Sequence, residues 1–197
     1  MINMLVKQGL LFYAVFFILL SGRIAMGTET GELLISNFDK SGEANVWRVI
    51  NDGVMGGVSS STWNITKSGN AVFAGTVSLD NNGGFASVRS PVGTYDLSAY
   101  KGIALRIKGD GKNYKLNLKT DAEFDSVLYQ AEFQTEKEKW QLIKVPFSKF
   151  TPTYHGVVLS DAPKLDAKAI RRFGFLIADK QQGPFQLEVD WIKAYRD

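Results

Sequence analysis

The chain has 197 residues, of which 45% are hydrophobic and 22% are charged, and its formal net charge is +3. This composition is typical of a globular protein and excludes an intrinsically disordered one. The sequence contains no cysteine, which excludes disulfides, thiolate metal sites and a cysteine nucleophile. It also lacks a cluster of lysine and arginine with interleaved aromatic residues, so we expect no nucleic-acid partner.

The N-terminal segment has the layout of a secretory signal peptide. Lys7 precedes an unbroken apolar run, Leu10–Leu20, and small residues precede a candidate cleavage site before Thr28. The apolar run is shorter than the about 20 residues of a membrane-spanning helix. We therefore predict a signal peptide over residues 1–27, a single domain over residues 28–197, and an exported location, periplasmic or extracellular. The alternative is a membrane anchor formed by an uncleaved leader, which would be the chain's only contact with a membrane.

Beyond the leader, short runs rich in β-branched and aromatic residues alternate with turn signals such as Asn-Gly-Gly and Gly-Asp-Gly. These runs predict strands, in chain order, over Leu33–Phe38, Val46–Ile50, Thr62–Ile65, Ala71–Val77, Phe85–Arg89, Gly102–Lys108, Tyr114–Thr120, Ser126–Phe133, Trp140–Val145, Arg172–Ile177 and Phe185–Tyr195. Two short segments, Leu97–Tyr100 and Asp166–Ile170, are expected to be helical. Many short strands joined by glycine-rich turns favour an all-β fold, an antiparallel β-sandwich of the jelly-roll type.

Alternation within the predicted strands indicates sheets with one buried face. In the run YKLNLKT, the residues Tyr114, Leu116 and Leu118 share one face and polar residues occupy the other. In Phe185–Tyr195, the apolar residues at every second position, up to Trp191, also share a face. A period of two places such residues on the same side of a strand.

The residues that carry catalysis or bind metals in other proteins have no distinctive context here. His155 is the sole histidine, and neither a G-x-S-x-G elbow nor a second zinc ligand accompanies it, so we interpret it as a loop or packing residue. Acidic residues such as Asp52 lie in loops, where a glycosidase would need two that face each other. We predict no enzyme, no catalytic residue, no metal and no cofactor, with an enzyme acting through Asp52 or His155 as the minor alternative. Calcium would suit the segments 80–82 and 121–125, which otherwise form polar turns.

The stretch WRVINDGVMGGVSSSTW, Trp47–Trp63, combines an Asn-Asp-Gly, a Gly-Gly pair and several hydroxyl residues. A phosphate-binding loop requires G-x-x-x-x-G-K-[ST], and this stretch contains no lysine. A dinucleotide-binding G-x-G-x-x-G is absent as well. The stretch is therefore expected to form a tight reversal between two strands, with glycines at positive φ and with Asn51 and Asp52 bonding backbone N–H groups.

The run NDGVMGGVSSS resembles the signature of the Complex I intermediate-associated protein 30 family. The segment GGFASVRS, the run GDGKNY, the pair Tyr129-Gln130 with Trp140, and the closing strands from Phe173 resemble later motifs of the same family. The resemblance covers residues 33–195. It implies a galactose-binding-domain-like jelly roll, in agreement with the strand pattern, and a chaperone-like assembly factor for respiratory complex I that does not catalyse a reaction.

From this resemblance we expect a non-catalytic binding module that docks an unidentified protein partner. The alternative is a carbohydrate-binding jelly roll, for which Tyr129 and Tyr154 are candidate stacking residues. The candidate site for partner or ligand binding comprises Asn51, Asp52, Met55, Ser59 and Arg89. The same five residues also suit a structural role, in which Arg89 pairs with Asp52 and the turn is fixed.

Overall fold

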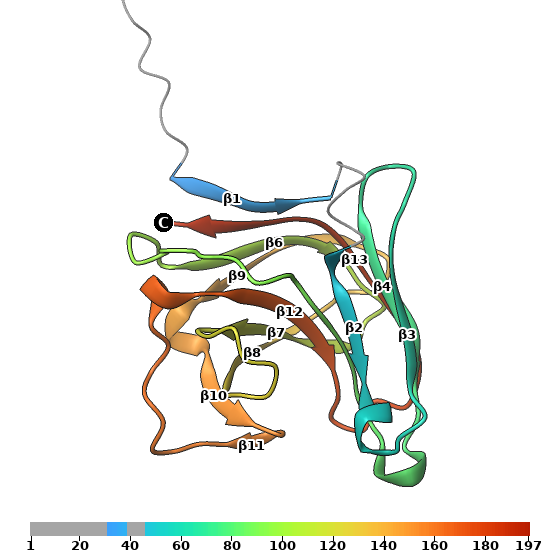
Figure 1. The fold of residues 1–197 in the computed structure, drawn as a ribbon. Helices are drawn as coiled ribbons and strands as arrows, with labels where there is room; N and C mark the ends of the chain where they lie inside the picture. Colours follow the sequence, from blue (N-terminus) through green and yellow to red (C-terminus); the bar gives the residue numbers. More distant parts are fainter. Residues whose placement is uncertain (1–30, 39–45) are drawn as a thin grey trace, which may run out of the picture.

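The computed structural model describes residues 31–38 and 46–197, so the predicted leader lies outside the described residues. Two antiparallel sheets pack face to face, which confirms the predicted β-sandwich (Figure 1). The strands are β1 (Glu32–Asn37), β2 (Arg48–Asn51), β3 (Ser60–Ile65), β4 (Ala71–Val77), β5 (Ala86–Arg89), β6 (Gly102–Lys108), β7 (Asn113–Lys119), β8 (Leu128–Gln134), β9 (Trp140–Pro146), β10 (Thr151–Tyr154), β11 (Val157–Val158), β12 (Arg172–Ile177) and β13 (Gly183–Tyr195). No helix within the described ranges is long and apolar enough to span a bilayer.

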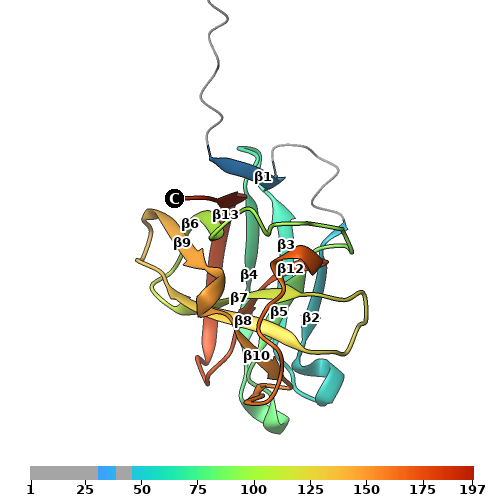
Figure 2. The same ribbon diagram turned by 90° about the vertical axis from the view of Figure 1, so that its left-hand side faces the viewer.

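The two sheets share the strands almost equally. One sheet has the order β3-β4-β13-β6-β9, with β1 also paired to β13, and the other has the order β11-β10-β8-β7-β12-β5-β2. Strands β2 and β3, which are consecutive in the chain, therefore belong to different sheets, and both views place them side by side (Figure 1 and Figure 2). The predicted reversal is thus a crossing from one sheet to the other.

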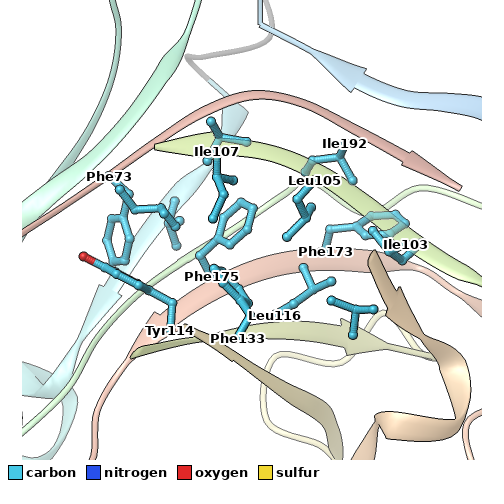
Figure 3. Close-up of a cluster of buried hydrophobic side chains, with 14 of the residues drawn as sticks. Phe73, Ile103, Leu105, Ile107, Tyr114, Leu116, Phe133, Phe173, Phe175 and Ile192 are labelled. Carbon is cyan, nitrogen blue, oxygen red and sulfur yellow. The ribbon is translucent and has the colours of Figure 1, made fainter. Parts of the chain in front are cut away.

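The core lies between the sheets. Ile103, Leu105 and Ile107 of β6 face Leu116 of β7 and Phe175 of β12, and all of these side chains are buried (Figure 3). Every second residue of these strands points inward, as the period of the sequence predicts. Because full burial of one such side chain stabilises the fold by about 1.5–3 kcal/mol, this face holds the sandwich together.

Aromatic side chains close the core beside the crossing between β2 and β3. The ring of Trp47 stacks on that of Trp63, with their centroids 4.8 Å apart, and Phe38 meets both rings edge-on. Phe175 also stacks against both rings. The two tryptophans that flank the glycine-rich stretch are therefore core residues that pack against each other on either side of the crossing.

The prediction that the alternate apolar residues of β13 share one face as far as Trp191 is wrong beyond Val189. The register of β13 against β6 shifts between Val189 and Trp191, which is the signature of a β-bulge. As a result Ile192 is buried, whereas Trp191 lies partly exposed beneath the ammonium of Lys193, whose Nζ is 4.4 Å from the ring centroid. One extra residue in a strand reverses every face that follows it.

The remaining differences concern short elements. Strands β10 and β11 were not predicted, because Pro152 within β10 argues against a strand; it is tolerated here beside the edge of the sheet, where only the two residues of β11 lie beyond. The predicted helical segment 97–100 is a turn closed by the bond from Tyr100 N–H to the Leu97 carbonyl. The other predicted helical segment is the short 3-10 helix η5, Ala167–Ala169.

Candidate functional site

The carboxylate of Asp52 lies at the centre of the crossing between the two sheets and is fully buried. Its Oδ1 accepts a hydrogen bond from Ser59 N–H at 2.9 Å, and its Oδ2 accepts one from Ser59 Oγ. Oδ2 also accepts bonds from the N–H groups of Gly84, at 2.7 Å, and Phe85, at 3.3 Å. A single side chain thus ties the crossing to the loop before β5.

Two glycines make room for this carboxylate. A Cβ added to Gly57 would lie 2.4 Å from Asp52 Cγ, and one added to Gly83 would lie 2.6 Å from Asp52 Oδ2. Gly56 has a different role, since its φ of 90° ends the 3-10 helix η2 (Asp52–Met55) in the left-handed region. In the motifs NDGVMGGVSS and GGFASVR, Gly56 and Gly84 therefore supply a positive φ, Gly57 and Gly83 allow close approach to Asp52, and Gly53 does neither.

The environment of Asp52 favours its ionised form. Burial acts to raise the pKa of Asp52, but the hydrogen bonds from Ser59, Gly84 and Phe85 outweigh it and hold the pKa below its ordinary value. Ser59 is itself buried, and Asn51 Oδ1 accepts a bond from Ser61 Oγ at 2.7 Å, which joins β2 to β3. In this structure Asn51, Asp52 and Ser59 are positioned to fix the crossing.

The other two candidate residues, Met55 and Arg89, point elsewhere. The side chain of Met55 is 60% exposed, next to the exposed Val54 in the same turn. Arg89 at the end of β5 does not pair with Asp52; its Nη1 donates to the Phe124 carbonyl at 3.0 Å. Both residues line a pocket of about 480 Å³ on the outer face of the seven-stranded sheet, which we call the sheet pocket.

Side chains of five neighbouring strands, β8, β7, β12, β5 and β2, form the floor of the sheet pocket, and mostly loops and turns form its walls. The floor consists of Ile50 on β2, Ser87 and Arg89 on β5, Leu176 on β12, Lys115 and Asn117 on β7, and Leu128 and Gln130 on β8. The walls consist of Val54 and Met55 of η2, Phe85, Phe124–Ser126 of the β7–β8 loop, His155 and Gly156 of the β10–β11 turn, and Ala178 and Asp179.

Three floor residues, Arg89, Asn117 and Gln130, lie in one row across the strands together with Gly174. Arg89 lies opposite Gly174, Gly174 opposite Asn117, and Asn117 opposite Gln130. Gln130 Nε2 donates to Asn117 Oδ1 at 3.1 Å. A Cβ on Gly174 would lie 2.6 Å from the Val88 carbonyl and 3.4 Å from Arg89 Cγ, so glycine leaves the space that the arginine side chain crosses. The floor thus contains a polar row, and the next row combines the apolar Leu176 with the polar Ser87 and Lys115.

The β7–β8 loop is held against the sheet by cations that bind its carbonyl groups. The buried Lys119 ammonium donates to the carbonyls of Glu123 and Phe124, and its Nζ lies 3.7 Å from Asp121 Oδ1. Burial lowers the pKa of Lys119, and the Asp121 carboxylate partly offsets that effect. Arg172 Nη2 also binds this loop, at the Ala122 carbonyl. Oxygen atoms of the β7–β8 loop therefore contact the Lys119 ammonium in the segment where the sequence suggested a calcium ion.

The tip of the same loop is linked to the β10–β11 turn across the sheet pocket. Asp125 Oδ2 accepts a bond from the Tyr154 hydroxyl at 3.1 Å, and Asp125 Oδ1 lies 2.8 Å from His155 Nε2. The hydrogen bond with His155 lowers the pKa of Asp125; burial opposes this effect, and the Tyr154 hydroxyl adds to it. The rings of Tyr154 and His155 stack with centroids 4.1 Å apart. These contacts join two walls of the pocket.

The acidic candidate Asp52 and the histidine occupy separate settings in the structure. Among them, no group of three or more histidine, cysteine, aspartate or glutamate side chains is arranged to hold a metal ion. The segment 80–82 forms the short 3-10 helix η3, Asp80–Asn82. Asp52 is engaged by its own loop, and His155 and Asp125 are both more than half exposed. The stacking prediction for Tyr129 is wrong because its ring is buried, whereas Tyr154 is exposed.

Sequence reasoning did not single out Asn117, Gln130 and Phe124. Asn117 lies on the polar face of an alternating strand, a face interpreted as solvated, and the structure buries it beneath the pocket. Phe124 is 65% exposed although it is a large apolar residue in an otherwise acidic loop. An aromatic residue between Glu123 and Asp125 was the signal that could have indicated a wall of a binding site.

The sequence profile of the family described as Complex I intermediate-associated protein 30 matches residues 36–189. Proteins named Complex I intermediate-associated protein 30, mitochondrial, are 29% identical in Drosophila melanogaster, over 74% of this chain and 57% of theirs, and 29% identical in Mus musculus, over 83% and 56%. The chain thus spans little more than half the length of these curated relatives.

Among solved structures, the family 11 carbohydrate-binding module of a cellulosomal cellulase of Clostridium thermocellum has a similar fold. The TM-score is 0.64 and the identity 20%, over 85% of this chain and 96% of the module. This likeness supports the β-sandwich fold that the sequence predicts.

The comparisons correct the predicted location. The apolar leader suggested an exported protein, periplasmic or extracellular, but the Drosophila and mouse relatives are both named mitochondrial proteins. The exported location is therefore wrong. An apolar run followed by small residues is a composition signal, and composition alone does not identify the membrane at which such a segment acts. The alternative, an anchor formed by an uncleaved leader, lies outside the described residues.

Proposed function

The chain belongs to the Complex I intermediate-associated protein 30 family, and from this premise we propose that its domain is a non-catalytic binding module that docks a segment of a partner protein in an assembly role. The observation that carries the proposal is the sheet pocket, whose walls present large apolar side chains to solvent. We call Val54, Met55 and Phe124 the apolar rim; each lines the pocket and is at least 60% exposed.

An exposed apolar rim on a well-packed domain requires an explanation. Single apolar residues on a surface are common, but several around one pocket are typical of a surface that another molecule covers. The rim is also rigidly mounted, because Asp52 fixes the turn that carries Met55 and cations fix the loop that carries Phe124. A pre-formed apolar surface loses little conformational entropy on binding.

The surroundings of the rim favour binding over chemistry. Asp125, one of the two aspartates that line the pocket, bonds to His155 in an exposed position. Ser126 also lines the pocket, but its hydroxyl donates to Asp121 and not to His155, so the serine–histidine bond of acyl transfer is not formed. The arrangement is suited to positioning walls around a bound segment.

Site-specific photo-crosslinking tests the proposal. Benzoylphenylalanine in place of Met55 or Phe124 is expected to attach to the same partner protein in cells that naturally make this chain. The matched control is Leu142, which is 59% exposed on β9 of the opposite sheet and should give no such product. Equal products from all three positions, or none from the rim, would contradict the proposal.

A carbohydrate is the second candidate occupant. The observation in its favour is the polar row on the floor, since Asn117 and Gln130 present amide groups that suit sugar hydroxyls, with Tyr154 exposed at the wall. A glycan array with wild type and an Asn117→Ala variant tests this reading. Carbohydrate binding in the sheet pocket requires a glycan that binds wild type and does not bind the variant. If no glycan binds wild type, the carbohydrate hypothesis is wrong.

A further inference from the structure

The charged side chains that line the sheet pocket are paired with one exception. Lys115 Nζ lies 2.8 Å from Asp179 Oδ2, and Asp125 bonds to Tyr154 and His155. Arg89 is the cation of the floor that, among the described residues, has no carboxylate within ion-pair distance. The pocket therefore presents one guanidinium that lies outside any ion pair of the described residues, with the Asp125 carboxylate acting on it only beyond ion-pair distance.

The guanidinium of Arg89 also has donors to spare. A guanidinium carries five N–H groups, and within the described part of the chain Arg89 gives one of them, at Nη1, to the Phe124 carbonyl. Its Nε is buried without a hydrogen-bond partner. The guanidinium carbon of Arg89 lies 5.6 Å from the centre of the Phe124 ring, so the charged group is adjacent to the apolar rim.

Further cations surround Arg89 and make a bound anion favourable. Arg172 and Lys119 lie close enough to repel it, and both already bind carbonyls of the β7–β8 loop. Burial, together with the repulsion from Arg172, lowers the pKa of Arg89, with Asp125 opposing that effect. A carboxylate at Arg89 would reduce this repulsion and would bind in a partly desolvated place, where ion pairs are stronger than at an open surface.

We propose that the sheet pocket binds an acidic, otherwise apolar segment of the partner protein, with an aspartate or glutamate carboxylate on Arg89 and the neighbouring apolar side chains on Met55 and Phe124. This inference rests on the proposed function and specifies the chemistry of the partner. An extended peptide suits the site because its side chains alternate between its two faces. The acidic side chains on one face of the peptide would reach Arg89 on the floor, and the apolar side chains on its other face would contact the apolar rim.

The rim favours a peptide over an acidic sugar. Sugars bind best on open, flat aromatic faces, whereas Val54 and Met55 are aliphatic and Arg89 lies over the ring of Phe124. Aliphatic side chains of a peptide match the first two residues by burial of apolar surface alone. An oligogalacturonate, which carries carboxylates on a sugar chain, is the corresponding comparison ligand.

The test uses an array of short extended peptides that alternate apolar residues with Glu, Gln or Lys. We expect Glu peptides to bind wild type about tenfold more tightly than the matching Gln peptides, and Lys peptides not to bind. Arg89→Met should remove the preference for Glu, and Arg89→Lys should retain part of it because charge remains without the planar donor pair. The matched control is Arg106→Met, an arginine that contacts Trp140 on the opposite sheet and should leave the preference unchanged.

Amide shifts at Met55 and Phe124 would place the bound peptides in the sheet pocket. Equal binding of Glu and Gln peptides at those residues overturns the acidic partner and leaves the proposed docking function intact. Binding of oligogalacturonate with no binding of any peptide overturns both. A Glu preference that persists in Arg89→Met, which a circular-dichroism spectrum shows to be folded, also overturns the assignment of the carboxylate to Arg89.

Discussion

Replacement of Asp52 by asparagine removes one charge from the crossing between the two sheets and changes almost no volume. The carboxylate accepts four hydrogen bonds, one at Oδ1 and three at Oδ2. In the better orientation of the new amide, its oxygen takes the place of Oδ2 and keeps the three donors there. Its nitrogen then faces the N–H group of Ser59, and two donors oppose each other.

The cost of this change follows from the bonds that are lost or weakened. A buried donor left without an acceptor costs about 1–3 kcal/mol, and each of the three remaining bonds weakens by about 1 kcal/mol when its acceptor loses its charge. Relaxation of the loop recovers part of the sum, so we expect Asp52→Asn to lower the free energy of unfolding by about 4 kcal/mol. For a domain of this size, that corresponds to a fall in Tm of about 10 °C.

Urea unfolding followed by tryptophan fluorescence measures this difference, since Trp47 and Trp63 stack beside the crossing. Asp80→Asn is the matched control, because Asp80 is exposed in the neighbouring η3 turn and should change the free energy by no more than about 0.5 kcal/mol. A loss below about 0.5 kcal/mol for Asp52→Asn as well would refute the structural role of the carboxylate.

The effect of Asp52 also depends on pH in a defined direction. Its pKa in the folded protein lies below the ordinary value of 3.8, so the unfolded chain binds more protons there and stability rises with pH. The contribution of the carboxylate is complete above the unfolded-state pKa and is lost as pH falls through the lower folded-state pKa. The difference between wild type and Asp52→Asn should therefore narrow below pH 3.8, and a constant difference would contradict the assignment.

Further predictions concern the surroundings of the sheet pocket. Gly57→Ala places a Cβ against the buried carboxylate and should lower the free energy of unfolding, measured by thermal unfolding, by about 2 kcal/mol. Gly53 has open space around it, so Gly53→Ala should lower the same free energy by less than about 0.5 kcal/mol. Lys119→Met removes the donor to two carbonyls of the β7–β8 loop and should speed amide hydrogen exchange there, with exchange in β6 unchanged. His155→Ala should raise the pKa of Asp125, measured by carboxyl NMR titration; an unchanged pKa would show that the bond between them does not persist in solution.

The fold was predictable because its signals are local and repeated. Alternation in β7 correctly placed Tyr114, Leu116 and Leu118 in the core. The same pattern failed for the opposite face, where Asn117 and Lys119 are buried as well. Alternation separates two faces of a strand, but it does not distinguish a solvated face from one that a distant loop covers.

The candidate site was only partly predictable for a related reason. The glycine-rich motif identified Asp52 and Met55. These two residues are only three positions apart in the chain, so they lie close in space whatever the fold. Phe124 and His155 come from loops far along the chain, and only the strand order of the seven-stranded sheet brings them to Arg89. Bulges such as that in β13, with no glycine or proline to indicate them, are equally invisible in the sequence.

The 3-10 turn η2 combines two requirements that can be separated by experiment. Asp52 at its start points inward and bonds the loop before β5, while Met55 at its end points outward to the sheet pocket. Met55→Ser should therefore leave stability within about 0.5 kcal/mol of wild type and weaken docking. Asp52→Asn should lower stability and, because it releases the turn that carries Met55, weaken docking too. Loss of docking in a fully stable Met55 variant would thus identify the rim as the contact surface, since no effect on the fold remains to explain it.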